Sequence, residues 1–146
     1  MDGEEIRRQN LFKEIDLIQE VIKRMASNSF LLKGWSLTLI TAFFVLINKK
    51  VLDSNLMFFV LLPLIVFWGL DAYFLRLERL YRKLYDWVIA NRLKTDDFLF
   101  DLRAESRFKG DVCCVFCVMF SKTLWWFYGS IFIATIGLIS KMKGWW

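Results

Sequence analysis

Few side chains in this sequence could carry catalytic chemistry. The 146 residues include no histidine, which excludes Ser-His-Asp and Cys-His catalysis, a histidine proton relay and histidine metal ligands. No Gly-rich phosphate-binding loop is present either. Cys113, Cys114 and Cys117 form a C-C-x-x-C pattern, and three thiolates could begin a soft-metal or redox site. Structural zinc prefers four ligands, and Asp111 is the one nearby candidate for the fourth.

The alternative is that these cysteines are small apolar residues in a membrane-contacting segment, where cysteine is commonly buried. We favour that alternative. The sequence therefore predicts no catalytic residues, no metal site and no cofactor, and we expect the protein not to be an enzyme.

Two charged residues and one proline border or interrupt apolar stretches. Lys33 lies 15 residues before Asn48, and Asp71 lies 16 residues after Asn55, which places them at similar depth in a helical hairpin. They could form an ion or gate site, a salt bridge that joins the hairpin, or simple headgroup contacts; the last two are the preferred interpretations. Pro63 predicts a kink, either structural or acting as a hinge.

Three uncharged stretches, each bordered by charges, set the fold class. Gly34–Asn48 has 15 residues, Ser54–Leu70 has 17 and Thr123–Ser140 has 18, whereas a membrane helix needs about 20 mostly apolar residues. The first reaches that length if it starts near Ser29 and Lys33 snorkels. We expect an all-α integral membrane protein with a single domain over 1–146. Its three transmembrane helices are predicted at 29–48, 54–75 and 122–140.

Two amphipathic helices are predicted outside the membrane. Residues 5–26 carry apolar side chains at 4-3-4-3 spacing, the pattern of a packed helix seam: Leu11, Ile15, Ile18, Ile22 and Met25. The second span continues as a cytoplasmic helix to residue 93, with the same spacing at Leu77, Tyr81, Leu84 and Val88. We expect the two helices to form a hairpin that buries both seams. Leu77, Tyr81 and Leu84 are also the candidate partner-binding residues.

The segments between these helices are less regular. Ser27-Asn28-Ser29 predicts a kink or a cap before the first span. Residues 94–121 predict a cytoplasmic loop, in which Thr95-Asp96-Asp97 caps a short helix and Gly110 ends it. Val112–Ser121 is too short to span alone, so it predicts an interfacial or re-entrant segment, with a fourth membrane segment as the alternative.

The basic residues are distributed unevenly about the predicted spans. Counted from the uncharged stretches, six lie before the first stretch and ten between the second and third, against four on the other side. This 16-to-4 asymmetry follows the positive-inside rule. It places the N-terminus and the central loop in the cytoplasm and the C-terminus on the outer side of the membrane. It also accounts for the net charge of +5 without direct nucleic-acid binding. The first 30 residues lack the apolar core of a secretory signal peptide, so we expect the N-terminus to be retained.

Small residues line one face of the predicted third span at Ser130, Ala134 and Gly137. Such residues allow close helix approach. They could pack within the chain against Thr38 and Ala42, or form a subunit interface. Because a three-span chain exposes more apolar seam than it can bury alone, we expect a homo-oligomer.

Two long strings, IQEVIKRMASNSFLLKGWSLTLITAFF and FWGLDAYFLRLERLYRKLYD, together with SKTLWWFYG, resemble a family of small bacterial membrane proteins. The resemblance covers about two thirds of the chain and includes the membrane accessory proteins of antiphage systems, namely type VI-B CRISPR and RADAR-type adenosine-deaminase operons. It implies a membrane effector or regulator that acts beside a cytoplasmic defence enzyme. The matching positions are Arg24, Asn28, Lys33, Gly34, Trp35, Trp68, Asp71, Tyr73, Glu78 and Arg79.

Two functions are consistent with these features. The first is an oligomeric inner-membrane effector that perturbs or permeabilises the bilayer in antiphage defence. The second is a membrane adaptor whose cytoplasmic helices recruit or regulate a partner enzyme. A polar-lined oligomer interior would favour the effector, and a groove on the cytoplasmic helices would favour the adaptor.

Overall fold

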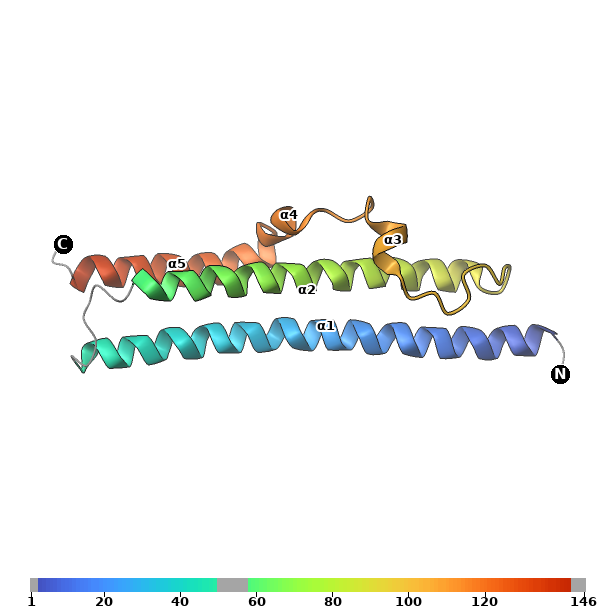
Figure 1. Cartoon of the computed structure of the whole chain (residues 1–146), viewed down its shortest axis with the longest axis horizontal. Coiled ribbons are helices and arrows are strands. Elements are labelled where there is room, and N and C mark those ends of the chain that lie inside the picture. The colour runs from blue at the N-terminus through green and yellow to red at the C-terminus, as the bar shows by residue number, and fades with distance from the viewer. Residues whose placement is uncertain (1–2, 50–57, 143–146) are drawn as a thin grey trace. The chain divides into compact units, whose positions relative to one another are not determined.

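The computed structural model describes residues 3–49 and 58–142, and within them the chain is all-helical with no strand (Figure 1). The predicted helical class is therefore confirmed. The chain divides into two compact units: unit 1 contains the residues up to Asn28 and Phe74–Cys114, and unit 2 contains Ser29–Tyr73 and the residues from Val115 onward. The helices are α1 (Gly3–Asn48), α2 (Phe58–Asn91), α3 (Ala104–Phe108), α4 (Val115–Met119) and α5 (Lys122–Met142).

The first predicted break in the chain is absent. Helix α1 runs without interruption through Ser27–Ser29, so the predicted cap is wrong, whereas the predicted kink stays a prediction. The Ser29 hydroxyl donates to the Asp71 carboxylate instead of to its own backbone. Helix α2 likewise continues through Pro63, and a hinge there stays a prediction. The predicted start of the second span, at residue 54, lies outside the described residues.

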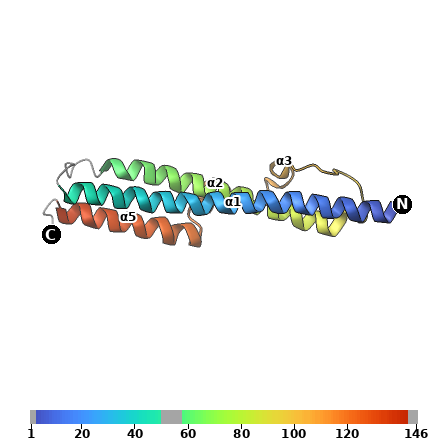
Figure 2. The same ribbon diagram turned by 90° about the horizontal axis from the view of Figure 1, so that it is seen from below.

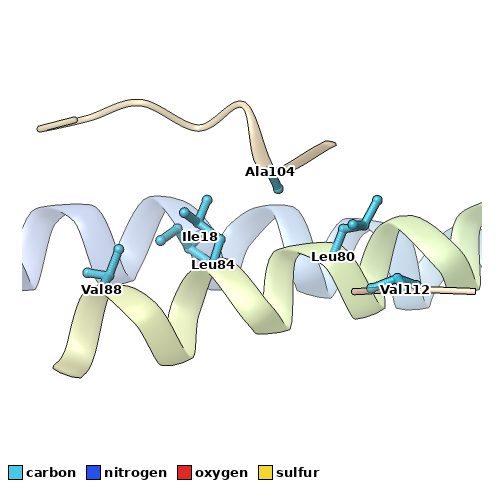
Figure 3. Packing of buried hydrophobic residues seen from close by; sticks show 6 residues of the cluster. All are labelled: Ile18, Leu80, Leu84, Val88, Ala104 and Val112. Atoms are coloured by element: carbon cyan, nitrogen blue, oxygen red, sulfur yellow. The ribbon is translucent and has the colours of Figure 1, made fainter. Parts of the chain in front are cut away.

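The core of unit 1 is the predicted helical hairpin. Ile18 of α1 is fully buried against Leu80, Leu84 and Val88 of α2, and Figure 3 shows these side chains together with Ala104 and Val112. The burial of both seams is thus confirmed. The same burial corrects one candidate: Leu84 is 0% exposed, so it is a core residue and is not accessible to a partner.

The loop of unit 1 differs from its prediction in one respect. Thr95 does not cap a helix; its hydroxyl accepts a hydrogen bond from the Asp97 amide within a turn, 3.2 Å away. The short helix α3 begins only at Ala104, and the residue before it makes no side-chain capping bond. Helix α3 does end just before Gly110, as predicted.

Unit 2 is a bundle in which α1, α2 and α5 lie side by side (Figures 1 and 2). Its most buried apolar side chains are Leu64, Ala72, Val118, Leu124 and Tyr128. The indole Nε1 of Trp68 donates to the Met119 carbonyl at 2.9 Å, which ties the end of α4 to α2.

The short helix α4 bears on the predicted number of spans. It has 5 residues, so it rises about 7 Å at 1.5 Å per residue, against a hydrocarbon core of about 30 Å. The alternative of a fourth membrane segment at 112–121 is therefore wrong. Among the described residues, one stretch, Gly3–Ile47, is long and apolar enough to cross a membrane, and only 11% of its most apolar window is buried.

Candidate functional site

The most unusual site in unit 2 is a buried carboxylate. Asp71 of α2 has a fully buried side chain, and its Oδ2 lies 2.6 Å from Nζ of Lys33 on α1. The other carboxylate oxygen, Oδ1, accepts a hydrogen bond from the Ser29 hydroxyl. Lys33 Nζ also donates to Ser29 Oγ at 2.8 Å. The three side chains therefore form a closed polar triangle between two helices.

Helical spacing explains why these side chains meet. Ser29 and Lys33 are four residues apart, so they project from the same face of α1. Trp68 and Ala72 of α2 flank Asp71 in sequence and are both buried, so Asp71 is on the inward face of its helix. The predicted Lys33–Asp71 ion pair is confirmed. Its role as a gate stays a prediction.

Two aromatic residues of α5 complete the surroundings of this cluster. Lys33 Nζ lies 6.0 Å from the centre of the Phe127 ring, within the range of a cation–π contact. The Tyr128 hydroxyl is buried and makes no hydrogen bond of good geometry among the described residues, although the side chains of Asp71 and Ser36 are close enough to interact weakly with it. Ser36 instead donates to the Leu32 carbonyl at 2.8 Å.

The arrangement can hold charge in an interior, which is otherwise costly. A buried ion costs several kcal/mol unless it is paired and hydrogen-bonded, and Asp71 has both a cationic and a hydroxyl partner. The Lys33 side chain remains 23% exposed, so one side of the pair is open to the surroundings. The site therefore combines a fully buried carboxylate with a partly exposed ammonium group.

The small residues of α5 do not pack within the chain. Ser130, Ala134 and Gly137 are exposed, and the space beside Gly137 is open. Thr38 and Ala42, the proposed intrachain contacts, are exposed as well. The intrachain alternative is therefore wrong for this face, because neither side is covered. A subunit interface stays a prediction.

The structure places the three cysteines at the surface. Cys113, Cys114 and Cys117 are exposed. Among the residues that the structure describes, no group of three or more potential metal-ligating side chains is close enough to hold an ion. Exposure also differs from the burial that we expected for these thiols.

Sequence reasoning missed a second buried ion pair, in unit 1. Glu14 of α1 and Arg92, just after α2, are both buried, and the guanidinium Nε and Nη2 lie 2.5 and 2.7 Å from the two carboxylate oxygens. Helical spacing in the sequence could have indicated this pair. Glu14 lies three residues after Leu11 and four before Ile18, within the apolar seam, and Arg92 follows Val88 by four.

Arg92 also organises the loop that follows α2. Its guanidinium donates to three backbone carbonyls, those of Thr95 (3.3 Å), Asp97 (2.8 Å) and Phe98 (3.3 Å). Phe98 and Phe100 take positive φ angles of 58° and 57°, a conformation that costs bulky L-residues about 1–2 kcal/mol. The many bonds to Arg92 fix the start of this turn and offset that cost.

The remaining candidates, Leu77 and Tyr81, are partly buried beside the core of unit 1. They line a groove of about 530 Å³ between α2 and the segment around α3, together with Leu102, Glu105 and Lys109. These two residues, unlike Leu84, remain accessible to a partner.

We compared the chain with known proteins, and no family model, curated protein or solved structure matches it.

Proposed function

We propose that the chain is an integral membrane protein with three spans, of which unit 2 is the membrane part. The observation that supports this is the distribution of polarity in unit 2. Its buried side chains include Ser29, Ser36, Asp71 and Thr135. Large apolar side chains are exposed on every long helix of the unit, including Phe30, Trp35, Leu37, Phe59, Leu62, Val66, Trp126, Ile133 and Leu138. Lipid tails are the solvent in which such a surface is stable.

The exposed hydroxyls of unit 2 fit lipid as well. Thr38 and Thr41 donate to carbonyls one turn earlier on α1, at 3.0 and 2.8 Å. Ser130 donates in the same way to Phe127 at 2.9 Å. Because each hydroxyl is satisfied by its own helix, none requires water or a second subunit.

Unit 1 differs from unit 2 in the charge on its surface. Charged residues such as Glu4, Lys13, Asp16 and Lys83 are exposed around its apolar core. Phe12 and Ile89 are exposed there as well, so the density of exposed charge, rather than a lack of exposed apolar side chains, supports contact with water. Together with the 16-to-4 asymmetry of basic residues, it supports a cytoplasmic unit 1 and an external C-terminus at a bacterial inner membrane.

From these features we propose the membrane adaptor as the function. Unit 2 anchors the chain, and unit 1 binds a cytoplasmic partner enzyme through the groove that Leu77 and Tyr81 line. The self-satisfied hydroxyls of unit 2 favour an anchor over a water-filled pore. The resemblance to membrane accessory proteins of antiphage systems suggests a defence enzyme as that partner.

The experiment compares membrane potential and phage protection in cells that express the chain together with the genes that flank its own. We expect Leu77→Ala/Tyr81→Ala to lose protection while the membrane potential stays normal throughout the response in every strain. Ile89→Ala is the matched control, since Ile89 is exposed on the same helix but is not among the residues lining the groove. Depolarisation that accompanies protection and persists in the Leu77→Ala/Tyr81→Ala variant would reject the adaptor.

Topology is tested separately with reporter fusions after Asn10, Lys49, Phe98 and Lys141. The proposal expects the reporters at residues 10 and 98 in the cytoplasm and those at 49 and 141 outside. A cytoplasmic reporter at residue 141 would reject the third span.

The second candidate is the oligomeric membrane effector, which the exposed face at Ser130, Ala134 and Gly137 favours. If this face joins subunits, Ala134→Trp should reduce the size of the detergent-solubilised particle. Ile136→Trp is the control, because Ile136 is already large and exposed on the same helix. A particle that is monomeric before any substitution would reject the effector.

A further inference from the structure

The surroundings of Lys33 Nζ have the shape of a binding site for a free ammonium group. An alkylammonium has three N–H donors. Two of them have oxygen acceptors, Asp71 Oδ2 at 2.6 Å and Ser29 Oγ at 2.8 Å. The third side of the ammonium faces the Phe127 ring, whose centre is 6.0 Å away. Two oxygens and an aromatic face are the groups that bind small ammonium cations.

The anion and the cation of this site differ in exposure. Asp71 is fully buried, and Lys33 is 23% exposed on a flexible four-carbon stem that can extend toward lipid headgroups. When Lys33 leaves, the carboxylate loses its cationic partner and must be neutralised by another cation or by a proton.

An independent observation indicates that the site has unused polar capacity. The buried Tyr128 hydroxyl makes no hydrogen bond of good geometry within the described part of the chain, yet it is near Asp71 and Ser36. Buried hydroxyls are nearly always paired with protein or with ordered water. Tyr128 therefore offers a further oxygen to an occupant that is not fixed to the position of Nζ.

We propose that Ser29, Asp71, Phe127 and Tyr128 form a binding site for a small primary ammonium cation, which Lys33 occupies in the resting chain. Such a cation enters when Lys33 withdraws, and the hairpin of α1 and α2 keeps its buried charge balanced in either state. This inference concerns unit 2 alone and does not depend on the adaptor function.

The test is chemical rescue of Lys33→Ala in the full-length protein in detergent. Removing the cation should lower the melting temperature by about 10 °C, as expected for a broken buried ion pair in a chain of this size. Methylammonium should restore most of that loss in a saturable manner. Choline at the same ionic strength should not, because its quaternary nitrogen has no N–H donor.

Three controls make the result specific. Lys33→Ala/Asp71→Asn should not respond to methylammonium, because the anion is gone. Lys49→Ala, at an exposed position directly after the same helix, should melt like the parent with or without the amine. Potassium should rescue less than methylammonium, because it donates no hydrogen bonds to the two oxygens.

Several outcomes would overturn the proposal: no amine effect on Lys33→Ala, an equal effect on the double variant, or equal rescue by potassium. Recovery of Lys33→Ala on acidification alone would assign neutralisation to a proton instead. If Lys33→Ala does not fold, methylammonium should raise its yield during solubilisation and stabilise the longer Lys33→Gln variant. Failure of both would equally reject the site.

Discussion

The buried Glu14–Arg92 pair gives the sharpest prediction for unit 1. In Glu14→Ala, Arg92 loses its two shortest hydrogen bonds, of 2.5 and 2.7 Å, and keeps only backbone carbonyls as acceptors. Removing one member of a buried ion pair costs about 3–5 kcal/mol. Because the bonds from Arg92 to the Thr95 and Asp97 carbonyls remain, we expect the lower end of that range, about 3 kcal/mol.

Hydrogen exchange measures this loss locally, without assuming that both units unfold together. A destabilisation of about 3 kcal/mol corresponds to roughly 100-fold faster exchange, at 1.4 kcal/mol per factor of ten. The acceleration should appear at the backbone amides of Leu84 and Val88, which belong to the buried cluster (Figure 3). Glu20→Ala is the control, since Glu20 is exposed on the same helix and should leave these rates unchanged.

A double variant separates the charge from the packing. Glu14→Leu/Arg92→Met replaces the pair with apolar side chains of similar size, and such replacements are often neutral or stabilising. We expect slower exchange at Leu84 than in Glu14→Ala. Exchange in Glu14→Ala less than about threefold faster than in the parent would refute the reasoning, because the pair would then be irrelevant to the hairpin.

Two further predictions concern the loop of unit 1. Hydrogen bonds from the Arg103 side chain and backbone lower the pKa of Asp101 below its ordinary value of 3.8. The stability that this pair contributes is therefore present at neutral pH and is lost as the pH falls through the lowered pKa of Asp101. In Arg103→Ala, NMR titration of the carboxyl group should show that the pKa of Asp101 has moved back up. Phe100→Gly should leave the melting temperature unchanged or raise it by a few degrees, because glycine adopts a φ of 57° without strain; a clear drop would mean that the Phe100 ring is needed for packing.

The hairpin of unit 1 could be predicted from sequence because its signal is periodic and local. The seam that contains Ile18 and the run that contains Leu84 and Val88 repeat at helical spacing, and two such faces have few ways to be buried. Helix α2 accordingly ends at Asn91, two residues before the predicted limit. Spacing alone does not show which residues of a seam are fully buried and which are partly exposed. For this reason the sequence predicts Leu84 as a partner-binding residue and does not single out Leu80.

The loop after α2 could not be predicted because its geometry depends on distant residues. Thr95 and the two aspartates after it have the composition of a helix cap. The turn there is instead fixed by Arg92, whose own position depends on Glu14, 78 residues away in sequence. Helix-cap propensity depends only on residues that are neighbours along the chain, so a contact between distant residues can override the local preference. The Lys33–Asp71 pair, 38 residues apart in sequence, was predictable because both residues are charges at the ends of uncharged stretches.

Each buried ion pair fixes how α1 and the α2 region align within its own unit. In unit 1, the acid lies on α1 and the base follows α2, as Glu14 and Arg92. In unit 2, the order is reversed, with Lys33 on α1 and Asp71 on α2. The separations along the chain are similar, 19 residues from Glu14 to Lys33 and 21 from Asp71 to Arg92. A parallel alignment of the same helices would place Glu14 against Asp71 and Lys33 against Arg92, so that like charges would meet at both sites. Apolar seams alone tolerate slippage by a heptad, whereas buried charges do not, because a shifted register leaves each ion without its partner. The reversed order of charges therefore favours one antiparallel register over its competitors, a role that fully apolar seams could not perform.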